Sequence, residues 1–322
     1  ALPICAFDAE HPLFIMYTSG TTGQPKGLVH TSGGYLAAAS WTHDFLFSHP
    51  DPARRDDDVH WCTADLAWVT AHTYEIYGPL SNGLTQVIYE GTPGEPHRER
   101  HLEIIERYGV TVYYTAPTLI RTLMSWFGEE LPAGHDLSTL RLLGTVGEAI
   151  NPEAWIWFHR TFGRGELPII DTWWQSETGS CVASPRPHDP QFAPSGTFPE
   201  GTPHTAAKPG CAVRPVPGVS TRVVDAAGEE VAAGEQGLIV VDAIGPSMAR
   251  TVWGDPQRYL SSYWADFGER GWFLAGDGAR LDEEGDLYIL GSWSINAGRT
   301  PPEMKRFIED LEGLMIALEG SR

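Results

Sequence analysis

The sequence lacks the long apolar runs that membrane helices require. Its longest apolar stretches, such as residues 13–17 and 238–241, stop far short of the roughly 20 residues that cross a bilayer. Residues 1–11 contain no basic start followed by an apolar core, so no secretory signal is expected in the sequence as given. The chain also begins without methionine, which indicates a piece of a longer protein. A soluble protein without a membrane partner is therefore predicted.

Basic residues and cysteines are also scarce. Lys and Arg number 22 against 42 Asp and Glu, and the formal net charge is -20. No basic cluster is denser than Arg54-Arg55 or Lys305-Arg306, so binding of nucleic acid is not expected. The four cysteines at positions 5, 62, 181 and 211 show no C-x-x-C spacing. This spacing argues against a zinc site or a redox motif and favours a reduced, cytoplasmic location.

Apolar residues make up 42% of the 322 positions, which is enough for a large core and more than one subdomain. In the first half, β-type runs alternate with helical patterns, which is typical of an α/β protein with a mostly parallel sheet layered with helices. The expected strands are residues 13–18, 86–89, 111–114, 140–143 and 169–170. The expected helices are residues 102–108, 117–127 and one that begins after Asn151 as N-cap, with Pro152 in its first position.

The character of the sequence changes after residue 184. Residues 184–217 are rich in Pro, Gly, Ser and Thr and predict a long loop or a boundary. Short strands are expected at 221–224, 238–241, 272–275 and 287–290, separated by turn residues, and a helix at 301–318. We therefore expect an α/β region at residues 1–205, a smaller β-rich subdomain at 206–291, and a hinge with a terminal helix at 292–322.

Residues 17–27, with the sequence YTSGTTGQPKG, follow an apolar strand and predict a phosphate-binding loop. Glycines at 20, 23 and 27 let the backbone turn tightly and bring N–H groups close to an anion. Thr18, Ser19, Thr21 and Thr22 add hydroxyl donors, and Lys26 adds a positive charge. The spacing differs from the Walker A pattern, because Pro25 precedes the lysine and Gly27 follows it. A bare Gly/Ser/Thr loop would otherwise be a surface turn.

Three further strings accompany the loop in order: WCTADLAWVT at 61–70, GTVGEAIN at 144–151 and DTWWQSETG at 171–179, followed by Gly276-Asp277-Gly278. Together they resemble the acetyl-CoA synthetases, a family of the adenylate-forming, AMP-binding superfamily. The resemblance covers about residues 10–291. It implies the large-domain core of that superfamily, and an AMP-forming ligase that converts acetate and ATP into acetyl-AMP and then transfers the acetyl group to coenzyme A. ATP, Mg²⁺ and coenzyme A are the implied cofactor and co-substrates.

The resemblance also implies roles for individual residues. The catalytic residues would be Lys26 and Glu177, with Glu177 as the Mg²⁺ ligand. The implied ATP and AMP site consists of Thr18, Ser19, Gly20, Thr21, Thr22, Gly23, Lys26, Gly147, Glu148, Ala149, Asp171, Thr172, Trp173, Trp174, Gln175, Ser176, Asp277 and Arg299. Within it, Ser176 would reach the α-phosphate and Asp277 both ribose hydroxyls. The implied acyl pocket consists of Trp68, Val69, Thr70, Val146 and Trp174, and the large indole favours acetate, then propionate.

Plainer interpretations compete with several of these roles. Taken alone, Trp174 would more often be a core residue, Asp277 a turn residue and Glu177 a solvated carboxylate. Set against the resembled family, the sequence as given is expected to lack the N-terminal part and the C-terminal lysine domain, and residues 292–294 (SWS) stand where the family has an arginine. Residues 192–206 resemble an insertion.

Two classes of alternative function therefore stay open. One is a catalytically impaired nucleotide-binding module, which the absent lysine domain would explain. The other is a ligase for propionate or another short-chain acid, or an enzyme that passes a longer acyl group to coenzyme A or to a carrier-protein thiol. The sequence carries no signal for an oligomeric state.

Overall fold

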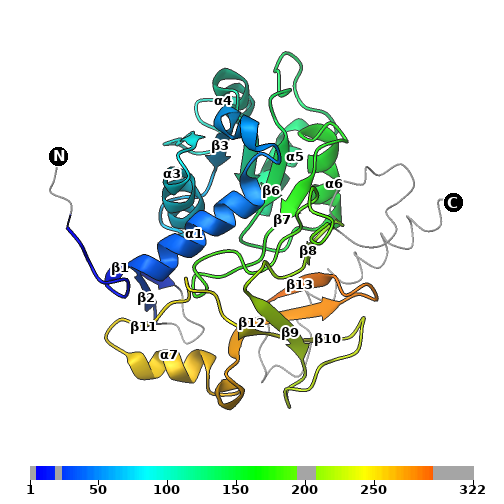
Figure 1. Ribbon diagram of the computed structural model, residues 1–322. Helices are drawn as coiled ribbons and strands as arrows, with labels where there is room; N and C mark the ends of the chain where they lie inside the picture. The colour runs from blue at the N-terminus through cyan, green and yellow to red at the C-terminus, as the bar shows by residue number, and fades with distance from the viewer. Residues whose placement is uncertain (1–4, 19–23, 194–207, 293–322) are drawn as a thin grey trace.

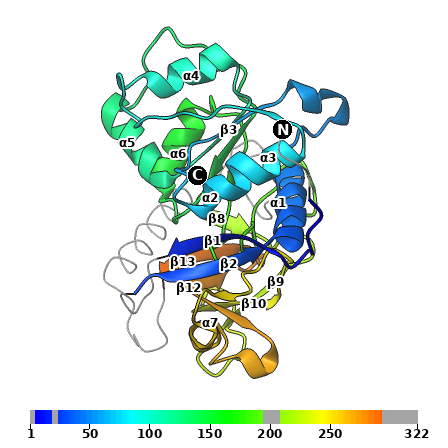
Figure 2. The ribbon, with the colours of Figure 1, turned by 90° about the vertical axis from the view of Figure 1, so that its left-hand side faces the viewer.

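The computed structural model describes residues 5–18, 24–193 and 208–292. In these residues the strands form three sheets: one parallel sheet of five strands, one antiparallel sheet of three, and one antiparallel sheet of five (Figure 1). Figure 2 shows the parallel sheet with its helices above, and the two antiparallel sheets with helix α7 below. None of the described helices is both long and apolar enough to cross a membrane.

The parallel sheet has the strand order β4-β3-β5-β6-β7. Its strands are β4 (Thr85–Gln86), β3 (Val59–Cys62), β5 (Val112–Thr115), β6 (Leu142–Thr145) and β7 (Ile169–Asp171). Every residue of β5, β6 and β7 is buried, as expected for parallel strands that are covered on both faces. The predicted α/β class with a parallel sheet is confirmed.

Successive strand residues point to opposite faces of this sheet, and helices cover both faces. On one face, Tyr113 packs in a core cluster with α4 (Arg100–Tyr108), α5 (Pro117–Phe127) and α6 (Pro152–Thr161). On the other, its neighbour Tyr114 belongs to a larger cluster with α1 (Ser32–Phe47) and the π-helical turn η2 (His72–Tyr77). Between these elements lie η1 (Pro52–Asp57), α2 (Val69–Ala71) and α3 (Gly78–Ser81).

The antiparallel sheets complete the larger core cluster. The smaller has the order β1-β2-β11, with β1 (Pro12–Thr18), β2 (Lys26–Thr31) and β11 (Thr251–Val252). The larger has the order β8-β13-β12-β10-β9, with β8 (Cys211–Val213), β13 (Leu287–Ser292), β12 (Phe273–Leu281), β10 (Gln236–Ala243) and β9 (Ser220–Val224). Helix α7 (Pro256–Tyr263) and the turn η3 (Gly268–Arg270) connect β11 to β12.

The structure corrects several details of the sequence prediction. The first expected strand, residues 13–18, forms a hairpin with β2 and is not part of the parallel sheet, and neither β2 nor β3 was predicted. Asn151 occupies the N-cap position of α6, but its side chain makes no capping hydrogen bond. The expected helix at 301–318 and the proposed boundary at residue 205 lie outside the described residues, so the three-part division stays a prediction.

Candidate active site

Lys26 opens β2, at one end of the loop that is predicted to bind phosphate. Its Cα is paired with that of Thr18 at the end of β1, so the two ends of the loop lie side by side. Only 10% of the Lys26 side chain is exposed, and burial lowers the pKa of its ammonium group although Glu177 opposes this shift. The predicted loop residues Ser19, Gly20, Thr21, Thr22 and Gly23 lie outside the described residues, as does Arg299.

Glu177 faces Lys26 from the segment that follows β7. The Lys26 Nζ atom lies 3.7 Å from Oε1 of Glu177, and 13% of the glutamate side chain is exposed. The hydroxyl of Tyr263, the last residue of α7, accepts a hydrogen bond from Lys26 and donates one to the same Glu177 oxygen. A second cation is close, because Arg258 on α7 donates to the carbonyl oxygens of Gln24 and Pro25. The predicted catalytic pair is therefore in contact through a tyrosine.

The segment that carries Glu177 is held against β2 by a buried histidine. His30 Nε2 lies 2.8 Å from the carbonyl oxygen of Ser176, and Nδ1 lies 3.0 Å from that of Ser247. Burial lowers the pKa of the His30 ring to about 4, so at neutral pH the ring carries one proton and donates to one of these two carbonyls. The Ala249 N–H donates to the Glu177 carbonyl oxygen at 2.8 Å. These contacts leave the Glu177 side chain directed toward Lys26.

Asp277 lies inside β12 and not in a turn, which corrects the plainer of its two interpretations. Its Oδ2 atom accepts hydrogen bonds from Trp173 Nε1 at 3.1 Å and Gln175 Nε2 at 2.8 Å. Burial raises the pKa of the carboxyl group and these two hydrogen bonds lower it. Both donors reach the same oxygen, and no described residue donates a hydrogen bond to Oδ1.

The remaining predicted nucleotide residues lie at the ends of β6 and β7, where ligands bind in open parallel sheets. Asp171 is buried, accepts a hydrogen bond from Thr145 Oγ1 at 2.7 Å, and burial raises its pKa to about 7. Thr172 Oγ1 donates to the Thr145 carbonyl oxygen at 2.9 Å and lies 2.6 Å from the Tyr114 hydroxyl. The structure thus anchors Asp171 and Thr172 to the parallel sheet.

Residues 147–149 follow β6. Gly147 has a φ of 95°, a conformation that favours glycine, and both Gly147 and Glu148 are exposed while Ala149 is half-buried. The Glu148 carboxylate is bonded to the first turn of α5, accepting from Thr118 N at 2.8 Å and Arg121 Nη2 at 2.9 Å. The Glu148 side chain is therefore bound to α5, so the backbone of residues 147–149, and not this side chain, can contact a ligand.

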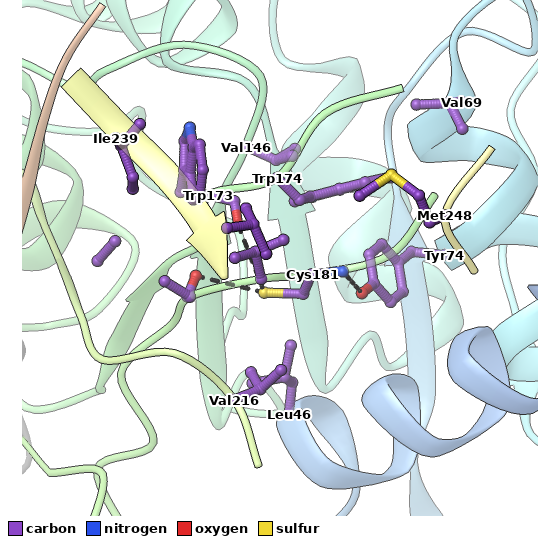
Figure 3. Packing of buried hydrophobic residues seen from close by; sticks show 14 of the residues in the cluster. Leu46, Val69, Tyr74, Val146, Trp173, Trp174, Cys181, Val216, Ile239 and Met248 are labelled. Atoms are coloured by element: carbon purple, nitrogen blue, oxygen red, sulfur yellow. Dashed lines mark hydrogen bonds between the residues drawn. The ribbon is translucent and has the colours of Figure 1, made fainter. Parts of the chain in front are cut away.

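Three of the five predicted acyl-pocket residues, Val69, Val146 and Trp174, share one apolar cluster, and a fourth, Thr70, is also buried. Val69, Thr70, Val146 and Trp174 are all 9% exposed or less, and Trp174 packs with its ring edge-on to Tyr74 at a centroid distance of 5.2 Å. Figure 3 shows Trp174 together with Tyr74 and Met248 in this cluster. Trp68 is different, because it is 68% exposed and the structure does not bring it into the cluster.

Tyr74, Tyr263 and His30 are the functional candidates that the sequence analysis missed. The Tyr74 hydroxyl accepts from Cys181 N at 2.8 Å and donates to Thr42 Oγ1 at 3.0 Å, which orients its ring beneath the indole of Trp174. None of the three belongs to a motif with a recognisable spacing. Tyr263 lies 237 residues from Lys26 along the chain, so only the folded structure reveals their contact.

Glu75 on η2 lies beside this cluster, and the effect of burial on the pKa of its carboxyl group can be tested. It is 4% exposed, and burial together with the charge of Asp65 raises its pKa from 4.5 to about 7. A folded state that holds this proton more tightly loses stability as the pH rises from 4.5 to 7. Glu75→Gln removes this loss. The difference in free energy of unfolding between the variant and the wild type should therefore rise by roughly 3 kcal/mol, in favour of the variant, from pH 4.5 to pH 7.

Chemical denaturation at pH 5 and pH 8 measures this difference for Glu75→Gln. Glu90→Gln is the matched control, because Glu90 is exposed. An equal effect of pH on both variants and the wild type would contradict the assignment of a buried, protonated Glu75.

The donor set near Lys26 fits a magnesium ion that arrives with a nucleotide. Among the described residues there is no group of three or more His, Cys, Asp or Glu side chains that would hold a metal by itself. Mg²⁺ is usually bound by one or two carboxylates, several waters and the substrate phosphates. Glu177, with a partly exposed carboxylate beside a lysine, meets that requirement. We therefore do not assign a metal site formed by protein side chains alone.

A separate cavity of about 620 Å³ lies away from these residues. Its lining includes Ala37, Asp44, Arg55, Asn82 and Thr85 and none of the predicted site residues. The Lys26–Glu177 ion pair and the apolar cluster around Trp174 are instead found at β2 and in the segment that follows β7. Such an arrangement suits a phosphorylated ligand and a small apolar group next to each other.

The family model of the AMP-binding enzymes matches residues 2–253. Acetyl-coenzyme A synthetase of Mycolicibacterium smegmatis is 54% identical over 292 residues, which cover 89% of this chain and 29% of that protein. Acetyl-coenzyme A synthetase of Streptomyces avermitilis is 55% identical over 286 residues, which cover 89% of this chain and 40% of the relative. The chain thus spans less than half the length of these curated relatives.

A solved structure shares the fold. The anthranilate CoA ligase AuaEII, determined in complex with anthranoyl-AMP, superposes with a TM-score of 0.72 at 24% sequence identity. The match covers 91% of this chain and 49% of the ligase. At this level of identity the likeness concerns the arrangement of the sheets and helices.

Proposed function

Because the chain belongs to the family of AMP-binding enzymes, we propose that it activates acetate with ATP as part of an AMP-forming acetate–CoA ligase. The observation that carries the proposal is that residues 173–177 contribute both to the Lys26–Glu177 ion pair and to the Trp173–Gln175–Asp277 hydrogen bonds, and also carry Trp174 of the apolar cluster. The names of the two relatives at 54% and 55% identity support acetate as the acid.

In the proposed first half-reaction, an oxygen of acetate attacks the α-phosphorus of ATP. The new C–O–P bond forms as the bond between the α-phosphorus and the bridging oxygen breaks, and pyrophosphate leaves. In the second half-reaction the thiol of coenzyme A attacks the acetyl carbon, AMP leaves with the carboxylate oxygen, and the thiol proton is released. No protein nucleophile is required, so the chain contributes positioning and charge neutralisation.

Each group has a proposed task in this scheme. Lys26, with the hydroxyls and glycines of residues 18–23, binds the distal phosphates, and Ser176 binds the α-phosphate. Glu177 would hold Mg²⁺, which supplies charge neutralisation at phosphoryl oxygens when it is bound. The wall of the adenine site is assigned to Gly147, Glu148, Ala149, Asp171, Thr172 and Trp173, with Gln175 supporting Asp277. Val69, Thr70, Val146 and Trp174 enclose the methyl group of acetate.

Acetate-dependent exchange of labelled pyrophosphate into ATP tests the proposal. This exchange reads the first half-reaction alone and needs no coenzyme A. We expect exchange that requires both acetate and Mg²⁺, and binding of ATP and AMP by the chain. Failure to bind either nucleotide would refute the proposal, whereas binding without exchange would favour a nucleotide-binding module.

Asp277→Ala should weaken ATP and AMP equally, because both nucleotides contain the same ribose. A carboxylate that accepts hydrogen bonds from two hydroxyls contributes roughly 1.5–3 kcal/mol, so the affinity should fall about 10- to 100-fold. Asp266→Ala, at an exposed position, is the control and should change neither affinity. Isothermal titration measures both; a loss confined to ATP would place Asp277 near the distal phosphates and not the ribose.

A further inference from the structure

Tyr263 is the residue through which the two proposed catalytic side chains meet. Its hydroxyl oxygen accepts a hydrogen bond from Lys26 and its proton is donated to Glu177. The direction of both bonds follows from chemistry, because an ammonium group can only donate and an ionised carboxylate can only accept. A phenol supplies one donor and one acceptor, so it satisfies both neighbours at once.

The same ring lies under the Lys26 ammonium group. The Nζ atom is 4.4 Å from the centroid of the Tyr263 ring, within the range of a cation–π contact. Lys26 and Glu177 remain 3.7 Å apart, which is longer than a hydrogen bond.

The tyrosine itself is held firmly. It is 6% exposed, and its ring stacks on Phe273 of β12 at a centroid distance of 5.2 Å. The Asp255 side chain accepts from Arg258 N at 3.1 Å at the start of α7, which stabilises the helix that carries Tyr263. The hydroxyl is therefore presented to Lys26 and Glu177 from a packed helix and not from a loop.

We propose that Tyr263 is a positioning residue of the nucleotide site, whose hydroxyl keeps Lys26 and Glu177 apart and aimed at a metal-bound triphosphate. This inference rests on the proposed function. Without the hydroxyl, the ion pair, now at 3.7 Å, closes to hydrogen-bond distance. At 10% and 13% exposure such a pair is poorly solvated, so a nucleotide and its metal ion have to break it before they bind.

Tyr263→Phe removes this hydroxyl and retains the ring that stacks on Phe273. The expected result is an affinity for ATP in the presence of Mg²⁺ that is about 10-fold lower, with an affinity for AMP within about 2-fold of the wild type. AMP has no distal phosphates, so it does not compete with a Lys26–Glu177 pair. The Mg²⁺ concentration that half-saturates ATP binding should rise in parallel.

Tyr259→Phe is the matched control on the same helix. The Tyr259 hydroxyl donates to the Ala249 carbonyl oxygen at 2.6 Å and not to Glu177. It should leave both nucleotide affinities unchanged. Titration calorimetry with ATP and AMP, with Mg²⁺ and with a chelator, measures all three proteins, and thermal unfolding monitors their folding.

The outcomes separate this inference from the proposed function. If the wild type binds no ATP, the proposed function fails and this inference fails with it. If the wild type binds ATP and Tyr263→Phe matches Tyr259→Phe, only the inference is overturned. It is overturned as well if Tyr263→Phe loses ATP and AMP equally, or unfolds where Tyr259→Phe stays folded, because the hydroxyl then serves stability.

Discussion

Lys26→Ala is expected to lower the affinity for ATP about 100-fold while it changes the affinity for AMP by less than about 3-fold. The lysine charge is proposed to bind the distal phosphates, which AMP lacks, and a hydrogen bond to a charged group contributes roughly 1.5–3 kcal/mol. The starting position supports this size of effect, because the ammonium group is largely buried and already lies beside Glu177. Equilibrium titration with ATP and AMP in the presence of Mg²⁺ measures the ratio.

Two comparisons sharpen this experiment. Asp277→Ala should show the opposite pattern, with equal losses for both nucleotides, so the pair of variants separates phosphate from ribose contacts. Lys26→Arg keeps the charge but changes its geometry, and it should recover part of the affinity for ATP. Equal losses of ATP and AMP in Lys26→Ala would show that the phosphate loop is misassigned.

Trp174→Gly is expected to reverse the order of acid substrates. The indole is 9% exposed and packs against Tyr74 within the Val69–Val146 cluster, so its removal opens a space that several methylene groups can fill. Each methylene in an apolar pocket changes kcat/KM about 10-fold or more. The ratio of kcat/KM for valerate to that for acetate should therefore rise at least about 100-fold in acid-dependent pyrophosphate exchange.

The control for Trp174→Gly has to separate pocket size from general loosening of the core. Trp155→Gly opens a cavity of the same size in the other core cluster, between α6 and the parallel sheet, and should leave acetate preferred. Both variants should lose roughly 3–5 kcal/mol of stability, so folding is checked by circular dichroism before the assay. If the Trp174→Gly variant is folded and still prefers acetate, Trp174 is a core residue and not part of the acyl pocket.

Local sequence patterns located four of the five strands of the parallel sheet, β4, β5, β6 and β7, and missed β3. Helix α5 begins and ends at the predicted residues, Pro117 and Phe127, because a proline opens it and Gly128 follows it. The patterns failed where pairing partners are far apart along the chain. Nothing near β2 indicates that β11 will pair with it from residue 251. Such contacts depend on tertiary packing and leave no local signature.

The residues of the candidate site were likewise predicted only in part from the sequence. The motifs at 144–151 and 171–179 led to Asp171, Trp174 and Glu177; the structure brings Glu177 to Lys26 and Trp174 into the apolar cluster, and bonds Asp171 to Thr145. Trp68 was included because of its neighbours in sequence, yet its side chain points to solvent. Tyr263 was missed because a tyrosine at the end of a short helix is ordinary in sequence. Only its hydroxyl geometry distinguishes it.

The position of β2 affects the order in which the chain can fold during synthesis. This fully buried strand is the centre of its sheet, and its second edge is covered only by Thr251–Val252 of β11. A ribosome delivers residues 26–31 long before residue 251, so the nascent strand waits with one side unpaired, and unpaired strand edges promote aggregation. Fragments that stop before residue 251 should therefore need chaperones or precipitate, however complete their nucleotide motifs are.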